Sequence, residues 1–202
     1  MSNNASNQIK SLISLNDFFI LSKARLSLSV VFSSLSGYFL APTIIDFQEI
    51  IFLSIGGFFL AGSSNAFNQI IEKDYDKKMQ RTKNRPIPTG RMSVTHALFI
   101  SIFMLILGLI SLYVLNPITA MFGAISVFIY TCVYTPLKSI TPLSVFLGAI
   151  PGAIPFMLGW VSATNDFSIE PGILFMIQFF WQFPHFWAIA WIYHDDYKKV
   201  GF

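Results

Sequence analysis

Long apolar runs alternate with short polar breaks along most of the chain. A helix needs about 20 mostly apolar residues to cross the hydrocarbon core of a bilayer, so runs of that length predict spanning helices. Six such runs are present, at 18–40, 47–71, 94–115, 118–134, 142–163 and 172–193. Proline is expected to end or begin a helix at Ala41-Pro42, Asn116-Pro117 and Thr135-Pro136. The pattern predicts an all-α, polytopic transmembrane helical bundle.

The composition supports a bilayer as the solvent of this chain. Hydrophobic residues make up 54% of the 202 residues and charged residues 11%, with a mean hydropathy of +0.62, too apolar for an ordinary soluble domain. The single cysteine, Cys132, excludes an internal disulfide, and its apolar setting favours a core residue over a thiol catalyst. The polar start of the chain lacks the apolar core of a cleaved signal and the arginines of a mitochondrial transit peptide. A bacterial plasma membrane is therefore expected.

All 13 basic residues fall on one side of the bilayer when the six spans are threaded alternately. That side receives Lys10, Lys23, Arg25, the cluster at 73–91, Lys138, Lys198 and Lys199. The opposite loops contain only acids, namely Asp46, Glu49, Asp166 and Glu170. The positive-inside rule makes the basic side cytoplasmic. Residues 1–17 are expected to form a polar cytoplasmic segment and 18–202 the membrane domain. The net charge of +3 then reflects orientation rather than nucleic-acid binding, because the basic residues lie in short loops between apolar segments.

Three oxygen-bearing side chains recur at the end of the second predicted helix. Asn68, Glu72 and Asp76 are spaced at i, i+4 and i+8, so they share one face of a continuous helix, whereas Asp74 points elsewhere, as a solvated charge would. Carboxylates at the mouth of a membrane helix are costly without a cationic partner. Mg²⁺ prefers oxygen ligands and characteristically uses one or two carboxylates plus phosphate oxygens.

A basic loop with two prolines follows at 77–91 and suits a metal-bridged phosphate ligand. The alternative is a positive-inside loop beside snorkelling acids, and the spacing alone does not decide between them. A second acidic point, Asp195-Asp196, lies at the end of the sixth predicted helix, on the same side. Two carboxylate sites at one mouth are typical of metals bound around a diphosphate.

Together these residues resemble the intramembrane prenyltransferases of the UbiA superfamily, and within it the branch that farnesylates protoheme IX. The motifs that carry the resemblance are Asn68-x3-Glu72-x3-Asp76, the string KMQRTKNRP at 78–86, Tyr134-x3-Lys138, Pro151-Gly-Ala-x-Pro155 with Gly159-Trp160, and Gln182-Phe-Pro184-His185-Phe leading to Asp196-Tyr197. Their order and helix positions match over nearly the whole chain. Because superfamily members usually have about nine transmembrane helices, the resemblance implies that six are visible here and that the C-terminal helices are lacking.

The resemblance implies a transferase that moves a farnesyl group from farnesyl diphosphate to the vinyl group of protoheme IX, making heme O and releasing diphosphate. It implies that the catalytic, Mg²⁺-binding residues are Asn68, Glu72, Asp76 and Asp196. It implies that the diphosphate is held by Arg25, Arg81, Arg85, Lys138 and Tyr134. The implied partners are farnesyl diphosphate, heme b and the lipid bilayer, with heme-oxidase assembly factors left open.

Two departures from the family pattern bear on these expectations. Lys23 and Arg25 are similar to a Lys-Pro-Arg motif, but Ala24 replaces the proline. Asp195 and Asp196 are adjacent, whereas many relatives outside the heme branch have two Asp four residues apart, which leaves the number of metals open.

His185 and the rival functions complete the expectations. An ionisable side chain two turns inside the end of a membrane helix is a functional candidate, so His185 is expected either to contact heme or to be a buried, hydrogen-bonded structural residue. Two other functions stay open: a UbiA-type enzyme acting on an aromatic or quinone precursor, and a transporter. A transporter would place ionisable groups near the bilayer midplane, whereas the acids here cluster at one mouth.

Overall fold

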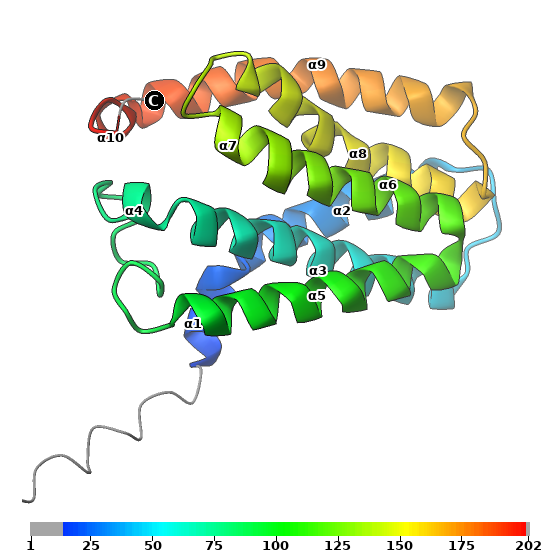
Figure 1. Cartoon of the computed structure of the whole chain (residues 1–202). Helices are drawn as coiled ribbons and strands as arrows, with labels where there is room; N and C mark the ends of the chain where they lie inside the picture. Colours follow the sequence, from blue (N-terminus) through cyan, green and yellow to red (C-terminus); the bar gives the residue numbers. More distant parts are fainter. Residues whose placement is uncertain (1–13, 201–202) are drawn as a thin grey trace, which may run out of the picture.

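The structure of the protein is a computed structural model that describes residues 14–200, and those residues form helices and no strand (Figure 1). The elements are α1 Leu15–Leu21, α2 Ala24–Leu40, α3 Phe47–Ile71, α4 Lys73–Asp76, α5 Val94–Leu115, α6 Pro117–Phe128, the π-helix η1 Ile129–Tyr134, α7 Thr135–Leu137, α8 Ser144–Thr164, α9 Ile169–Ile192 and α10 His194–Lys198. Lys10 and most of the expected polar segment 1–17 lie outside the described residues.

Five spans are long and apolar enough to cross a membrane, or six if the bent pair α1 and α2 is one span. The predicted multi-span, all-α bundle is confirmed. The helices α3 and α5 have the predicted bounds because polar residues cap their starts. Asp46 Oδ1 accepts a hydrogen bond from Gln48 N, and Ser93 Oγ accepts one from His96 N. Asn116 caps α6 in the same way, directly before Pro117.

The first span differs from the single helix predicted at 18–40. The chain breaks between α1 and α2 and turns by 57°. Ser22 Oγ donates back to Phe18 O, and the Gln69 amide of α3 donates to Ile20 O and Leu21 O, the carbonyls that a continuing helix would have used. The break is therefore made by a distant helix rather than by a local breaker residue.

The fourth span extends past its predicted end at Tyr134, although the short helix α7 does begin at Thr135-Pro136 as predicted. The span runs through η1 and α7 to Leu137. A proline cannot donate to the carbonyl four residues back and its ring crowds that carbonyl, so the wider π turn accommodates Pro136. Thr135 Oγ1 donates to Tyr130 O at 2.8 Å, which satisfies one carbonyl of the altered turn.

Small residues allow the helices to pack closely. A Cβ atom added at Gly37 would collide with Phe156 O, and one at Gly159 would collide with Ser34 O, so α2 and α8 cross with their backbones in contact. The largest buried apolar cluster joins α2, α3, α5, α6 and α8. The helix α9 contributes no buried member to this cluster; it packs mainly against α8, and its half-buried Phe175 contacts the edge of the cluster.

The short helices α4 and α10 and the loop at 77–93 gather at one end of the bundle, on the left of Figure 1. We call this the charged end. Within the described residues, the acidic loops that follow α2 and α8 lie at the opposite end, as the alternating threading predicts.

Candidate functional site

The stripe of Asn68, Glu72 and Asp76 lies at the charged end and is less regular than predicted. The helix α3 ends at Ile71, and Glu72 has φ −92° and ψ 10°, outside the helical range. The hydrogen-bond ladder nevertheless continues across the break, because Glu72 N donates to Asn68 O at 2.9 Å and Asp76 N donates to Glu72 O at 2.8 Å. The three side chains therefore stay on successive turns, and all are at most 4% exposed.

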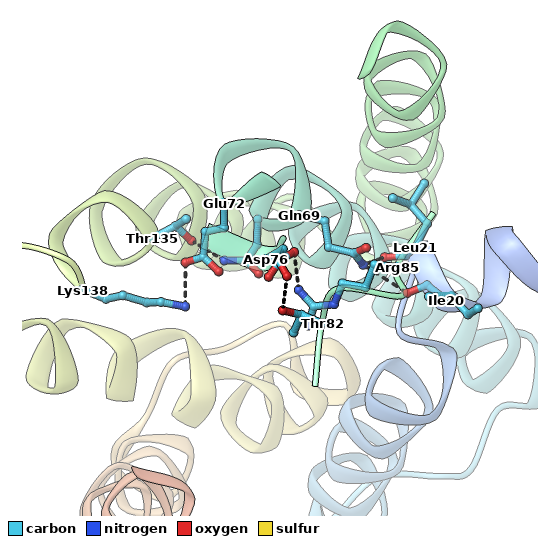
Figure 2. Close-up of polar contacts among 10 residues, drawn as sticks. Ile20, Leu21, Gln69, Glu72, Asp76, Thr82, Arg85, Thr135 and Lys138 are labelled. Carbon is cyan, nitrogen blue, oxygen red and sulfur yellow. Dashed lines mark hydrogen bonds and ion pairs between the residues drawn. The ribbon is translucent and has the colours of Figure 1, made fainter. Parts of the chain in front are cut away.

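Each buried carboxylate of the stripe forms an ion pair with a cation from another part of the chain (Figure 2). Lys138 Nζ lies 2.6 Å from Glu72 Oε1, and Arg85 Nη1 lies 2.7 Å from Asp76 Oδ2. Asp76 Oδ1 is also buried and has no hydrogen-bond partner within residues 14–200. The acids do not snorkel to solvent, which was the alternative left open by the spacing. They form a buried, paired cluster in which Asp76 Oδ1 has neither a hydrogen bond nor an ion pair within the described residues.

Asn68 connects the stripe to the end of the fourth span. Its Nδ2 donates to Thr135 Oγ1 at 3.3 Å, so its amide oxygen is not used in that bond. Thr135 directly follows η1, so the end of the fourth span contacts the stripe twice, through Thr135 at Asn68 and through Lys138 at Glu72.

The basic loop is folded rather than loose. Thr82 is fully buried, and its Oγ1 donates to Asp76 O at 3.0 Å. Met79, Pro86 and Ile87 are also buried. The loop is thus built around the end of α4, which brings Arg85 against Asp76.

Asp196 of α10 anchors this loop from the other side. Its carboxylate accepts hydrogen bonds from Gln80 N at 3.2 Å, Arg81 N at 3.1 Å and Lys199 Nζ at 2.9 Å. The bond from Lys199, aided by the two backbone N–H groups, holds the pKa of Asp196 below its usual range. Within the described residues, no three His, Cys, Asp or Glu side chains lie close enough to hold one metal ion. Glu72, Asp76 and Asp196 therefore do not form a single three-carboxylate site in this conformation.

The two remaining arginines predicted to bind diphosphate differ in their surroundings. Arg81 is exposed, and its guanidinium lies 4.6 Å from the centre of the Tyr193 ring, a cation–π contact. Arg25 is exposed near the start of α2, and its side chain makes no ion pair or hydrogen bond within residues 14–200. The structure thus brings Arg85 and Lys138 onto the acidic stripe, places Arg81 at its rim, and leaves Arg25 apart.

Lys23 is a site residue that the sequence reasoning missed. It lies at the break between α1 and α2, with φ 45° and ψ 56°. Its ammonium is close enough to interact electrostatically with Glu72, Arg81, Arg85 and Lys138. In the continuous helix that the apolar pattern predicted, residues two apart point about 200° apart, so Lys23 and Arg25 could not both face one site. That spacing was the available signal that one of the two had to be chosen.

Tyr134 lines an open cavity of about 410 Å³ beside the acidic stripe. Lys138, Phe186, Trp187 and Tyr197 line the same cavity, so it adjoins the Lys138–Glu72 ion pair. Burial raises the pKa of the Tyr197 hydroxyl, which therefore remains a neutral hydrogen-bonding group at physiological pH.

His185 is exposed on α9 and stacks on Trp181, with ring centroids 4.9 Å apart. The alternative of a buried structural histidine is therefore wrong. Cys132 is likewise exposed, on η1, rather than in the core as expected.

Comparisons with known proteins agree with the architecture. The chain is 62% identical over 188 residues to a protoheme IX farnesyltransferase of Christiangramia forsetii, a match that covers 93% of the chain and 63% of that relative. It is 37% identical over 183 residues to the human mitochondrial protoheme IX farnesyltransferase, covering 90% of the chain and 41% of that protein. The chain thus spans less than two thirds of the length of these curated relatives.

A solved UbiA homolog from Archaeoglobus fulgidus, bound to GPP and Mg²⁺, superposes with a TM-score of 0.71 at 17% identity, over 92% of the chain and 66% of the homolog. At that identity the likeness concerns the fold. The family model for UbiA prenyltransferases matches residues 30–202, which is most of the chain. The chain therefore belongs to the UbiA prenyltransferase family.

Proposed function

We propose that the chain carries the diphosphate site of a Mg²⁺-dependent enzyme that transfers a farnesyl group from farnesyl diphosphate to the vinyl group of protoheme IX. The observation that carries this proposal is the buried cluster at the charged end, in which Glu72 pairs with Lys138 and Asp76 pairs with Arg85. In such a cluster the two carboxylates can release their basic partners to bind a metal cation. The released Arg85 and Lys138 can then bind the anionic oxygens of a ligand that carries this cation. The names of relatives at up to 62% identity support farnesyl transfer to protoheme IX.

The residues of the stripe fit a magnesium ion. The Asn68 amide and the two carboxylates supply oxygen donors, and the buried Asp76 Oδ1 has no hydrogen-bond partner in the described residues. An unsatisfied carboxylate oxygen at the mouth of a membrane helix is costly unless a cation offsets it. We propose that Asn68, Glu72 and Asp76 hold Mg²⁺, and that diphosphate oxygens complete its coordination. A metal-ligand role for Asp196 stays a prediction, because its oxygens already hold the loop.

Basic residues of the site would hold the leaving diphosphate. Arg85 and Lys138 would turn from their carboxylates to the diphosphate oxygens, with Lys23 and Arg81 supplying further positive charge and Tyr134 a hydroxyl donor. The Arg85 fork suits two oxygens at once, whereas each ammonium acts as a point charge. Bound Mg²⁺ would supply stabilisation of the negative charge on the diphosphate.

The proposed chemistry needs no side-chain nucleophile. The bond between the farnesyl carbon and the diphosphate oxygen breaks, the electron pair leaves with the diphosphate, and an allylic cation remains. The vinyl group attacks this cation, and a water molecule then adds to the porphyrin-side cation and loses a proton. The products are the hydroxyethylfarnesyl group of heme O and free diphosphate.

The test is turnover of farnesyl diphosphate and heme b by the purified protein, with and without Mg²⁺. Asp76→Asn should lower kcat/KM by about 100-fold, which corresponds to ~2.7 kcal/mol, because the neutral amide cannot balance a cation. Asp74→Asn is the matched control, since that side chain is 74% exposed and, within residues 14–200, pairs only with Lys77 in a surface ion pair. Magnesium-independent turnover, or an unimpaired Asp76→Asn variant, would contradict the proposal.

A UbiA-type enzyme for an aromatic or quinone precursor would use the same cluster, and competition between heme b and an aromatic acid in this assay separates the two acceptors.

A transporter is disfavoured, because the ion pairs at 72–85 and 138 lie at one end of the bundle rather than at its middle. We further propose that the charged end faces the cytoplasm of a bacterial plasma membrane. Contact with heme-oxidase assembly factors, and contact of His185 with heme, stay predictions.

A further inference from the structure

The end of α1 is held by polar side chains of α3. Gln69 Nε2 donates to Leu21 O at 2.7 Å and to Ile20 O at 3.1 Å, and Asn65 Nδ2 donates to Ser22 O at 3.5 Å. Gln69 is fully buried and Asn65 is 4% exposed, although both lie in a membrane-spanning helix. Buried amides in this setting are retained where they satisfy backbone groups that would otherwise be unpaired.

These hydrogen bonds hold an unfavourable backbone conformation next to the site. Lys23 adopts a left-handed conformation with φ 45°, which is sterically unfavourable for a residue with a Cβ atom. Such a conformation persists only where its surroundings determine it. Here the preceding carbonyls are fixed by α3, and Ser27 Oγ donates to Ser22 O at 2.8 Å from the following helix. The break therefore has a defined geometry, and so has the direction in which Lys23 leaves it.

The same turn of α3 carries both the acidic stripe and this support. Gln69 directly follows Asn68, and successive helical residues point about 100° apart. Figure 2 shows the result: Gln69 reaches toward Ile20 and Leu21, while Glu72 lies toward Thr135 and Lys138. One helix end thus sets the position of the carboxylates and of the break that bears Lys23.

We propose that Gln69, assisted by Asn65, is a positioning residue that fixes the Lys23 ammonium in the diphosphate site. The inference rests on the proposed function, because it assumes that Lys23 contacts the diphosphate. Gln69 itself does not touch the ligand. Its removal would let the α1–α2 break relax, and Lys23 would spend less time within reach of the phosphate oxygens.

The test compares Gln69→Met with Gln48→Met, the same change at an exposed position of the same helix. The measurement is the affinity of the purified protein for inorganic pyrophosphate with Mg²⁺, by titration calorimetry. Gln69→Met should weaken binding about tenfold, and Gln48→Met should leave it unchanged. Lys23→Ala should weaken binding to a similar extent, and the double variant should be no weaker than Lys23→Ala alone, because both changes remove one contact. Additive losses, or a Gln69→Met variant that binds like the unaltered protein, would overturn the proposal.

Two further measurements keep the outcomes distinct. If Gln69→Met does not fold, Asn65→Ala removes only the longest of these bonds and should weaken pyrophosphate binding in the same direction by about twofold. An unaltered affinity would again count against the proposal. The proposed function is tested separately by the turnover assay: it is contradicted if the unaltered protein binds pyrophosphate with Mg²⁺ yet makes no heme O. The positioning role is still decided by the binding cycle in that case.

Discussion

Asp196 shows how a single carboxylate organises the charged end. Hydrogen bonds from Lys199 and from the backbone N–H groups of Arg81 and Gln80 favour its ionised form and lower its pKa. A carboxyl with a lowered pKa contributes stability above its ordinary pKa and loses it as the pH falls through the lower, folded-state value. The anchoring of the basic loop is therefore expected to persist throughout the neutral range and to be lost only in acid, below the ordinary pKa of aspartate.

Neutralising this carboxylate should loosen the loop. In Asp196→Asn the backbone N–H groups lose a charged acceptor, and such hydrogen bonds are worth more than neutral ones. Trypsin cleavage within 77–85 is expected to become roughly fivefold faster, since cleavage follows the population of the opened loop. Asp195→Asn is the control, because Asp195 is an exposed neighbour that makes no hydrogen bond or ion pair to the loop within the described residues. Equal cleavage rates in the two variants would mean that Asp196 does not anchor the loop.

At the scale of helices, the crossing of α2 and α8 depends on the absence of side chains. A Cβ atom at Gly159 would overlap the Ser34 carbonyl, and a backbone cannot move aside as a flexible side chain does. Gly159→Ala is expected to force the helices apart and to destabilise the protein by ~1–3 kcal/mol. The measurement is the thermal unfolding midpoint in detergent. Gly172→Ala, in open space on α9, should leave the midpoint unchanged or raise it slightly because alanine favours helix. A midpoint for Gly159→Ala equal to that of Gly172→Ala would refute the close crossing.

The helix bounds could be predicted where they depend on local residues and not where they depend on distant ones. The helices α3 and α5 begin at Asp46 and Ser93 caps that follow directly from the printed sequence. The break after α1 could not be predicted, because its cause is Gln69, which is 48 residues away from Leu21. Pro136 misled the prediction for a different reason: a π turn in a membrane helix accommodates a proline that would end a helix in water.

At the scale of the whole molecule, the local features of the candidate site could also be predicted, whereas its contacts between distant residues could not. The spacing of Asn68, Glu72 and Asp76 predicted a shared face, and the three side chains do lie on successive turns. Their partners come from separate elements, so nothing in the spacing could pair Glu72 with Lys138 across 66 residues. The depth of His185 was predictable from its position in the span, but the face of α9 on which it lies was not. Tertiary contacts determine both the ion-pair partners of the stripe and the exposure of His185.

The one-sided distribution of basic residues makes a prediction about the orientation of the whole molecule. Lys83 lies exposed in the basic loop at the charged end, whereas Asp166 lies exposed in the acidic loop between α8 and α9. In a Cys132→Ser background, Lys83→Cys and Asp166→Cys each introduce a single thiol at an exposed loop position. The positive-inside rule predicts that a membrane-impermeant maleimide labels position 166 in intact bacterial cells and position 83 only in inverted membrane vesicles.

Each variant is the control for the other, because both should react fully once detergent dissolves the membrane. The reverse pattern would show that the charged end faces outward. Such a result would separate the diphosphate cluster from the cytoplasm, where the prenyl diphosphate is expected to be supplied, and would count against the proposed function as well as the topology. Labelling of both positions in intact cells would contradict the alternating arrangement of the spans, because an odd number of crossings must separate loops on opposite faces.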